Sequence, residues 1–160
     1  HWTGWIEHSV LAELPETLHG TSGSRLVVAL IALAVLPAVA EEMLCRGWIQ
    51  GVLVRRFGAA AGIAGSALVF GALHLDPVHA VAAAGLGLYL GLVAHWAGSI
   101  VPAILCHGLN NAAAVGFAAQ LGPSAGGLPT LLGAAAVAVG ALVWVGRRRA
   151  RREEIDPSGS

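Results

Sequence analysis

Lysine is missing from this 160-residue sequence, and charged residues of any kind are scarce, at 11% of the chain. Ordinary soluble domains carry about 25% charged residues and are about 45–50% apolar. This chain is 56% hydrophobic, with a mean hydropathy of +0.74. Nine basic residues balance nine acidic ones, and no basic stripe interleaves with aromatic residues, so we expect no nucleic-acid partner. Intrinsic disorder needs low hydrophobicity and high charge. The composition therefore predicts a membrane protein.

Cysteine is equally scarce. Cys45 and Cys106 both lie in apolar runs and form no CxxC pair, so they do not indicate a disulfide framework and are interpreted as small packing residues. No signal-peptide pattern is visible, because the first 20 residues carry three glutamates and no basic start. The sequence begins at His1 rather than methionine, so an earlier segment can be missing from it.

Long apolar runs, by contrast, are abundant. A helix needs about 20 apolar residues to cross about 30 Å of hydrocarbon. Glycine and serine at 98–99 and a Gly/Pro/Ser-rich stretch at 122–127 predict breaks between runs. We predict an all-α, polytopic membrane helix bundle of about five transmembrane helices, at residues 25–56, 59–75, 78–96, 100–120 and 128–145.

Three regions follow from this division. Residues 1–24 combine tryptophans with a partly apolar stripe, which predicts an interfacial helix or, because Pro15 interrupts the stripe, an irregular surface segment. Residues 25–146 form one intramembrane core. Residues 147–160 begin with an arginine cluster, and positive residues favour the cytoplasmic side, so a basic cytoplasmic tail is predicted. The high Ala and Gly content suggests a bacterial source and hence the inner membrane.

Away from the ends of the predicted spans, only three residues are charged, namely Glu41, Glu42 and Arg46. A charge at the bilayer centre costs about 2.5–3.5 kcal/mol even on the lenient insertion scale. Glu42 and Arg46 are four residues apart, so they share a helix face and can pair. Glu41 is rotated by about 100° from Glu42. One carboxylate can thus be neutralised by the arginine while the other points elsewhere.

Two further pairs have the same four-residue spacing. Phe70 and His74 share a face of the second span, and His107 and Asn111 share a face of the fourth. The polar residues of either pair, taken alone, could serve only in hydrogen bonds between helices, which stabilise by about 0.6 kcal/mol per contact. Together with two carboxylates and an arginine, they form the set that acid–base chemistry on a carbonyl needs.

These motifs resemble a known family. Residues 41–47 are similar to the EExxxR motif of the CPBP (Abi) family of intramembrane proteases, which includes the type II CAAX prenyl endopeptidases. Residues 70–74 resemble its FxxxH motif, and 107–111 its HxxxN motif. The resemblance covers about half of the chain, from about residue 35 to 114. In length the chain is also similar to the myxosortases, small members that process the C-terminal tails of exported proteins.

The resemblance implies an intramembrane endopeptidase that hydrolyses a peptide bond near the C-terminus or membrane segment of a protein substrate. Glu41 is expected to be the general base and His74 to share the water, while His107 and Asn111 donate to the oxyanion. The supporting residues are Glu42, Arg46 and Phe70.

Other interpretations stay open. Two histidines and a glutamate can bind zinc, so a metalloendopeptidase with Glu41, His74 and His107 as ligands is the alternative mechanism. The sequence has no HExxH helix, and an amide at position 111 is a poor zinc ligand, so we predict no cofactor. Intramembrane ionisable residues also mark ion pathways. A proton-relay or transporter subunit, or a non-catalytic membrane scaffold, is therefore the competing function.

Counting residues along the predicted spans gives the depth of the candidate site in the membrane. Arg55 and the arginine cluster lie four predicted crossings apart, so both are placed in the cytoplasm and Asp76 outside. A rise of about 1.5 Å per residue then brings the four site residues together in the middle to outer half of the membrane. This orientation favours an exported substrate over a cytoplasmic prenylated one.

Overall fold

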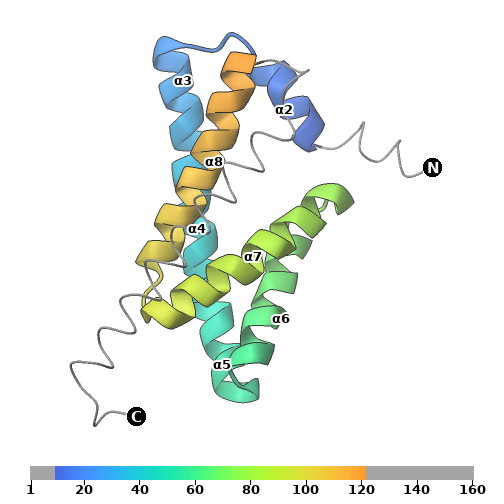
Figure 1. Cartoon of the computed structure of the whole chain (residues 1–160), viewed down its shortest axis with the longest axis vertical. Helices are drawn as coiled ribbons and strands as arrows, with labels where there is room; N and C mark the ends of the chain where they lie inside the picture. Colours follow the sequence, from blue (N-terminus) through green and yellow to red (C-terminus); the bar gives the residue numbers. More distant parts are fainter. Residues whose placement is uncertain (1–9, 122–160) are drawn as a thin grey trace.

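The computed structural model describes residues 10–121, and every regular element in that range is a helix (Figure 1). The predicted all-α class is therefore confirmed. The elements in chain order are α2 (Val10–Leu18), α3 (Gly23–Leu30), η1 (Ile31–Val35), α4 (Leu36–Glu42), η2 (Met43–Gln50), α5 (Gly51–Phe57), α6 (Ala59–Ala72), α7 (Pro77–Ala97) and α8 (Val101–Leu121). The predicted fifth span at 128–145 and the predicted tail at 147–160 lie outside the described residues.

Elements α3 to α5 form one continuous helix of 35 residues, Gly23–Phe57. Two of its segments, η1 and η2, are π-helical. Pro37 has no N–H and crowds the carbonyl group one turn earlier, which disfavours ordinary α-helical bonding in the segment before it. The helix ends at Gly58, whose φ of +84° suits glycine. Segment η2 begins immediately after Glu42, and π-helical turns are often found at functional sites.

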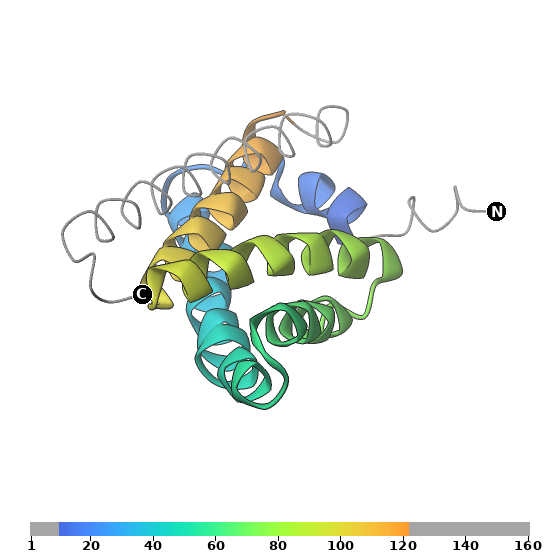
Figure 2. The same cartoon turned by 60° about the horizontal axis from the view of Figure 1, so that its bottom comes forward.

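Helices α6 and α7 form an antiparallel pair that lies side by side in both Figure 1 and Figure 2. Small residues allow the close approach, since a Cβ on Gly71 would lie 2.6 Å from the carbonyl oxygen of Ala80. The turn between the helices holds Leu75 at a φ of +57°. Asp76 then caps α7 by accepting hydrogen bonds from the backbone N–H groups of Val78 and His79.

Helix α8 runs beside the first half of the long helix, and the α6–α7 pair packs against the second half of the long helix (Figure 1). At one end of α8, Leu18 of α2 packs on Val115 and Ala118. The backbone N–H of Gly20 also donates to the carbonyl of Ala119 at 2.9 Å. The N-terminal segment therefore includes a helix that docks on the bundle, while its predicted position at the membrane interface stays a prediction.

Within residues 10–121, three helices are long and apolar enough to cross a membrane, Gly23–Phe57, Pro77–Ala97 and Val101–Gln120. Helix α6 is apolar but has only 14 residues, a rise of about 21 Å. It ends three residues before the predicted limit of the second span, because the chain turns at 73–76. The outside of the bundle exposes large apolar side chains, including Val28, Leu36, Met43, Trp48, Leu68 and Val81.

Candidate active site

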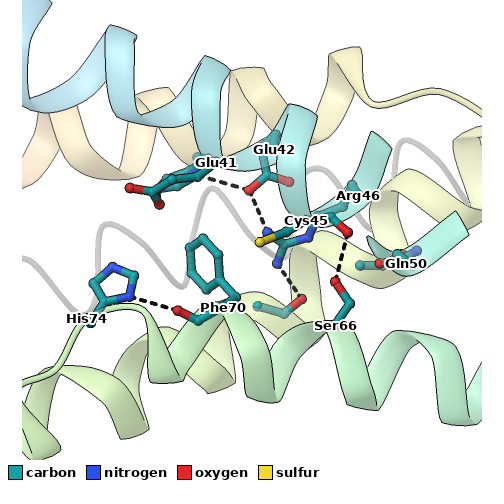
Figure 3. Close-up of polar contacts among 11 residues, drawn as sticks. Glu41, Glu42, Cys45, Arg46, Gln50, Ser66, Phe70 and His74 are labelled. Atoms are coloured by element: carbon teal, nitrogen blue, oxygen red, sulfur yellow. Dashed lines mark hydrogen bonds and ion pairs between the residues drawn. The ribbon is translucent and has the colours of Figure 1, made fainter. Parts of the chain in front are cut away.

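Residues of the three predicted motifs come together where α4 and η2 of the long helix pack against α8 and α6, respectively. Glu41, Glu42 and Arg46 come from the long helix, Phe70 from α6 and His107 from α8 (Figure 3 labels all of these except His107). The site therefore joins residues far apart in the chain, since Glu42 and His107, which bond to each other, are 65 positions apart.

Glu42 and Arg46 form the predicted ion pair. The guanidinium group donates through Nη1 to Glu42 Oε1 at 2.8 Å, and both side chains are fully buried. Through Nη2 it also donates to the carbonyl oxygen of Gly87 on α7, again at 2.8 Å. The arginine thus fixes the long helix against α7 as well as neutralising the carboxylate.

Phe70 is the apolar centre of the cluster and is 1% exposed. Its ring lies 4.5 Å from the guanidinium carbon of Arg46, within the range of a cation–π contact. The same ring makes edge-to-face contacts with His74, at a centroid distance of 5.1 Å, and with His107, at 5.5 Å. One aromatic side chain therefore contacts a residue of each motif.

His74 lies just beyond the end of α6, in the turn that leads to α7. Its Nδ1 is 2.9 Å from the carbonyl oxygen of Phe70. Because a carbonyl oxygen only accepts, Nδ1 must carry the proton, and Nε2 is the nitrogen left for other partners. The ring also packs edge-to-face on His79 of α7, with centroids 4.3 Å apart.

His107 bridges the two carboxylates. Its Nδ1 lies 3.0 Å from Glu42 Oε1, and its Nε2 lies 3.9 Å from Glu41 Oε2. The sequence predicted a partner for Glu42 only in Arg46, so the bond to His107 was missed. Helical spacing contains no signal for it, since the rotation of α8 relative to α4 is set by packing.

Glu41 and Glu42 differ sharply in exposure. The Glu41 side chain is 32% exposed, against 0% for Glu42. In the part of the chain that the structure describes, Oε2 of each carboxylate has no hydrogen-bond partner. Figure 3 shows the Glu41 carboxylate directed away from the Glu42–Arg46 pair, on the side where His74 lies. The predicted division between a carboxylate paired with Arg46 and one that points elsewhere is therefore present in the structure.

Asn111 is half-buried one turn after His107 on α8 and accepts a hydrogen bond from the Asn110 amide at 3.3 Å. Within residues 10–121 it forms no hydrogen bond to Glu41, His74 or His107. Of the predicted site residues it is the one that the structure does not link to the cluster.

Two buried polar residues near the cluster were missed. Gln50 donates to the carbonyl of Gly91 at 2.9 Å, and the Ser66 hydroxyl donates to the carbonyl of Cys45 at 2.9 Å. Gln50 lies four residues after Arg46, so extending the helical spacing by one turn would have found it. Ser66 gave no comparable signal.

The donor atoms do not form a metal centre. Among residues 10–121, no three His, Cys, Asp or Glu side chains converge closely enough to hold a metal ion. The zinc set that the sequence left open, Glu41, His74 and His107, is not found as such a group among these residues, and the zinc alternative stays a prediction. Whether activity needs a cofactor stays a prediction for experiment.

Apolar helices around a buried cluster of acids, bases and an arginine fit a membrane-embedded hydrolase, although ion pathways contain such residues as well. Comparison with known families agrees, since the family described as type II CAAX prenyl endopeptidase Rce1-like matches residues 23–113, more than half of the chain. The chain belongs to this family of CAAX proteases, which makes it a peptidase, and its apolar helices make it an integral membrane protein. No curated protein and no solved structure gives a significant match.

Proposed function

We propose that the chain is an intramembrane endopeptidase in which Glu41 activates the attacking water. The observation that carries this proposal is the contrast between two adjacent carboxylates, one neutralised by Arg46 and buried, the other partly exposed and without a hydrogen-bond partner. A general base must be ionised and free to accept a proton, and only Glu41 has such surroundings.

The remaining residues take the roles that the reaction requires. His74, with Nδ1 held by the Phe70 carbonyl, presents Nε2 to the water that Glu41 activates. His107, whose Nε2 lies near Glu41, donates to the developing oxyanion, and Asn111 is the second donor. Asn111 would reach this position with substrate bound, since catalytic hydrogen bonds often tighten only in the complex.

The proposed substrate is a membrane-associated protein cleaved near its C-terminus or within a membrane segment. Residues 23–113, which match the CAAX protease family, contain all three motifs. The arginine distribution favours an exported protein, as the myxosortase-like length does, and the bacterial inner membrane is the proposed location. We propose that hydrolysis needs no metal, because the sequence has no HExxH helix and the amide at position 111 is a poor zinc ligand.

Proteomics of protein C-termini tests the proposal in whole cells, whichever protein is the substrate. Cells that produce the wild type are compared with cells that produce Glu41→Gln, and Glu16→Gln on the exposed face of α2 is the matched control. We expect shortened C-termini with the wild type and Glu16→Gln, and their loss with Glu41→Gln. Identical fragment patterns for all three proteins would contradict a protease function.

His107 contacts both Glu42 and Glu41, and such a series of titratable groups also suits a proton relay, which is the competing function. Purified protein in liposomes separates the two. Proton flux that Glu41→Gln abolishes, without cleavage of candidate peptides, would favour the relay.

A further inference from the structure

We propose that Glu42 is a positioning residue for His107, in addition to neutralising Arg46. This inference rests on the proposed function of the site, because it assigns the residue that orients the oxyanion donor. It predicts that the second glutamate of the first motif contributes to turnover even when its role as a counter-ion is removed.

The contact geometry supports a dedicated interaction. Glu42 Oε1 lies 3.0 Å from His107 Nδ1 and 2.8 Å from Arg46 Nη1, so one oxygen serves both partners. All three side chains are buried. If Glu42 served only as a counter-ion, its Oε2 could accept the hydrogen bond from His107. Alternatively, His107 could form no bond to Glu42 and contact only the Phe70 ring. Instead Oε2 has no hydrogen-bond partner in the described part of the chain.

The shared oxygen also determines which histidine nitrogen carries a proton. Oε1 accepts from Arg46, so it is an acceptor, and Nδ1 of His107 must donate to it. This fixes the orientation of the ring and directs Nε2 toward Glu41, 3.9 Å away. The hydrogen bond made by one ring nitrogen sets the function of the other.

Charge balance gives an independent argument. For Nε2 to donate to an oxyanion while Nδ1 donates to Glu42, the ring must carry both protons. The four groups Glu41, Glu42, Arg46 and His107 then sum to zero formal charge, whereas a neutral ring leaves them at −1. An unbalanced charge is costly at membrane depth, so Glu42 allows His107 to act as a cationic donor.

A double variant separates this role from simple charge neutralisation. Glu42→Gln alone leaves Arg46 buried without its partner and can fail to fold. Glu42→Gln combined with Arg46→Met removes both charges, so a purely structural ion pair is no longer needed. Ser66→Ala is the matched control, because it removes a buried hydrogen bond to the same helix without touching His107.

The experiment combines ¹⁵N NMR of the His107 imidazole with cleavage of a substrate peptide in liposomes. In the wild type we expect a protonated, hydrogen-bonded Nδ1. In the double variant we expect a folded protein with altered His107 signals and turnover reduced by about 10²-fold, the scale of a small misplacement of a catalytic group. Ser66→Ala should keep the wild-type His107 signals and turnover within about twofold.

The results distinguish the two proposals. A wild-type Nδ1 without a proton overturns the positioning role, even if no variant folds. A folded double variant with wild-type turnover and signals overturns it as well. If the wild type cleaves nothing, or Glu41→Gln cleaves normally, the proposed function fails, but the NMR signals still decide whether Glu42 orients His107.

Discussion

Glu41 and Glu42 are neighbours in the chain, yet they lie in two different halves of the polar cluster. The closed half contains Glu42, Arg46 and Gln50, all buried and bonded to side chains or to carbonyl groups of α7. The open half contains Glu41, partly exposed, and His74 on its turn. Consecutive helical residues point about 100° apart, so one helix supplies both environments.

The difference shows how two identical side chains can have different roles. In the closed half, fixed partners determine the charge and position of the carboxylate. In the open half, the Glu41 side chain is 32% exposed, and His107 Nε2 lies 3.9 Å from its Oε2. Pairs of titratable groups in contrasting surroundings are how active sites assign acid and base roles.

The strongest test of this contrast is Glu41→Gln. We expect cleavage to fall by about 10²–10⁴-fold, the usual loss for a general base, because the amide cannot accept the proton of water. Thermal stability should stay near that of the wild type, since Glu41 has no hydrogen-bond partner in the described part of the chain. Cleavage and melting of a monodisperse preparation measure both, and near-normal cleavage would place the base elsewhere.

Arg46→Met should give the opposite result, a large loss of stability. It leaves Glu42 buried with only His107 as a partner, and breaking a buried pair costs about 3–5 kcal/mol. We expect low yield and a lower midpoint of unfolding in detergent. Arg55→Met, at an exposed position on the same helix, is the control and should be neutral. A stable Arg46→Met protein would show that the closed half is not held by its charges.

Gly71→Ala should disturb the open half through the backbone. The new Cβ would lie 2.6 Å from the Ala80 carbonyl oxygen and 2.9 Å from the Ala84 methyl group, which forces α6 away from α7 beside His74. Overpacking of this kind costs about 1–3 kcal/mol. Gly85→Ala on α7, where nothing lies within 4 Å of the new Cβ, should be neutral in the same unfolding assay. Equal effects of the two variants would contradict the packing argument.

Gln50→Leu should have a smaller effect on the closed half. The variant loses the hydrogen bond to Gly91 but also removes Oε1, a buried oxygen without a partner in the described residues. The two changes oppose each other, and we expect a shift in unfolding free energy within about 1 kcal/mol. A loss as large as that of Arg46→Met would show that Gln50 is essential to the closed half.

Removal of metal ions should have the smallest effect. Extended treatment with strong chelators should change cleavage by less than about twofold, because the sequence has no HExxH helix and the amide at position 111 is a poor zinc ligand. Elemental analysis of purified protein should find zinc below one ion per chain. Activity lost on chelation and restored by zinc would support the metalloendopeptidase alternative.

Local spacing predicted much of this site. The four-residue separation of Glu42 and Arg46 predicted their ion pair, because that pairing depends only on helix geometry. The same separation predicted a shared helix face for Phe70 and His74; their rings are in contact, but His74 lies in the turn beyond α6. The bond between Glu42 and His107 depends on how α8 is rotated against α4, which no local pattern encodes.

The end of α6 illustrates a second reason why part of the structure could not be predicted from the sequence. Its apolar residues continue to Leu75, so hydrophobicity alone placed the end of the span there. The helix ends at Ala72 instead, because Asp76 caps α7 and the chain must turn before it. Leu75 takes a φ of +57° without being glycine, so the turn carried no glycine signal in the sequence.

The shortness of α6 has a consequence for the surrounding lipid. Its rise of about 21 Å is about 9 Å less than the thickness of a typical hydrocarbon core. A bilayer meets such a mismatch by thinning locally, at a cost of fractions of a kcal/mol per Å. Headgroups and water then reach deeper beside α6 than beside the 21-residue α7. Under the proposed function, a peptide bond that approaches His74 beside a thinned bilayer would have less hydrocarbon to cross than one that approaches beside α7.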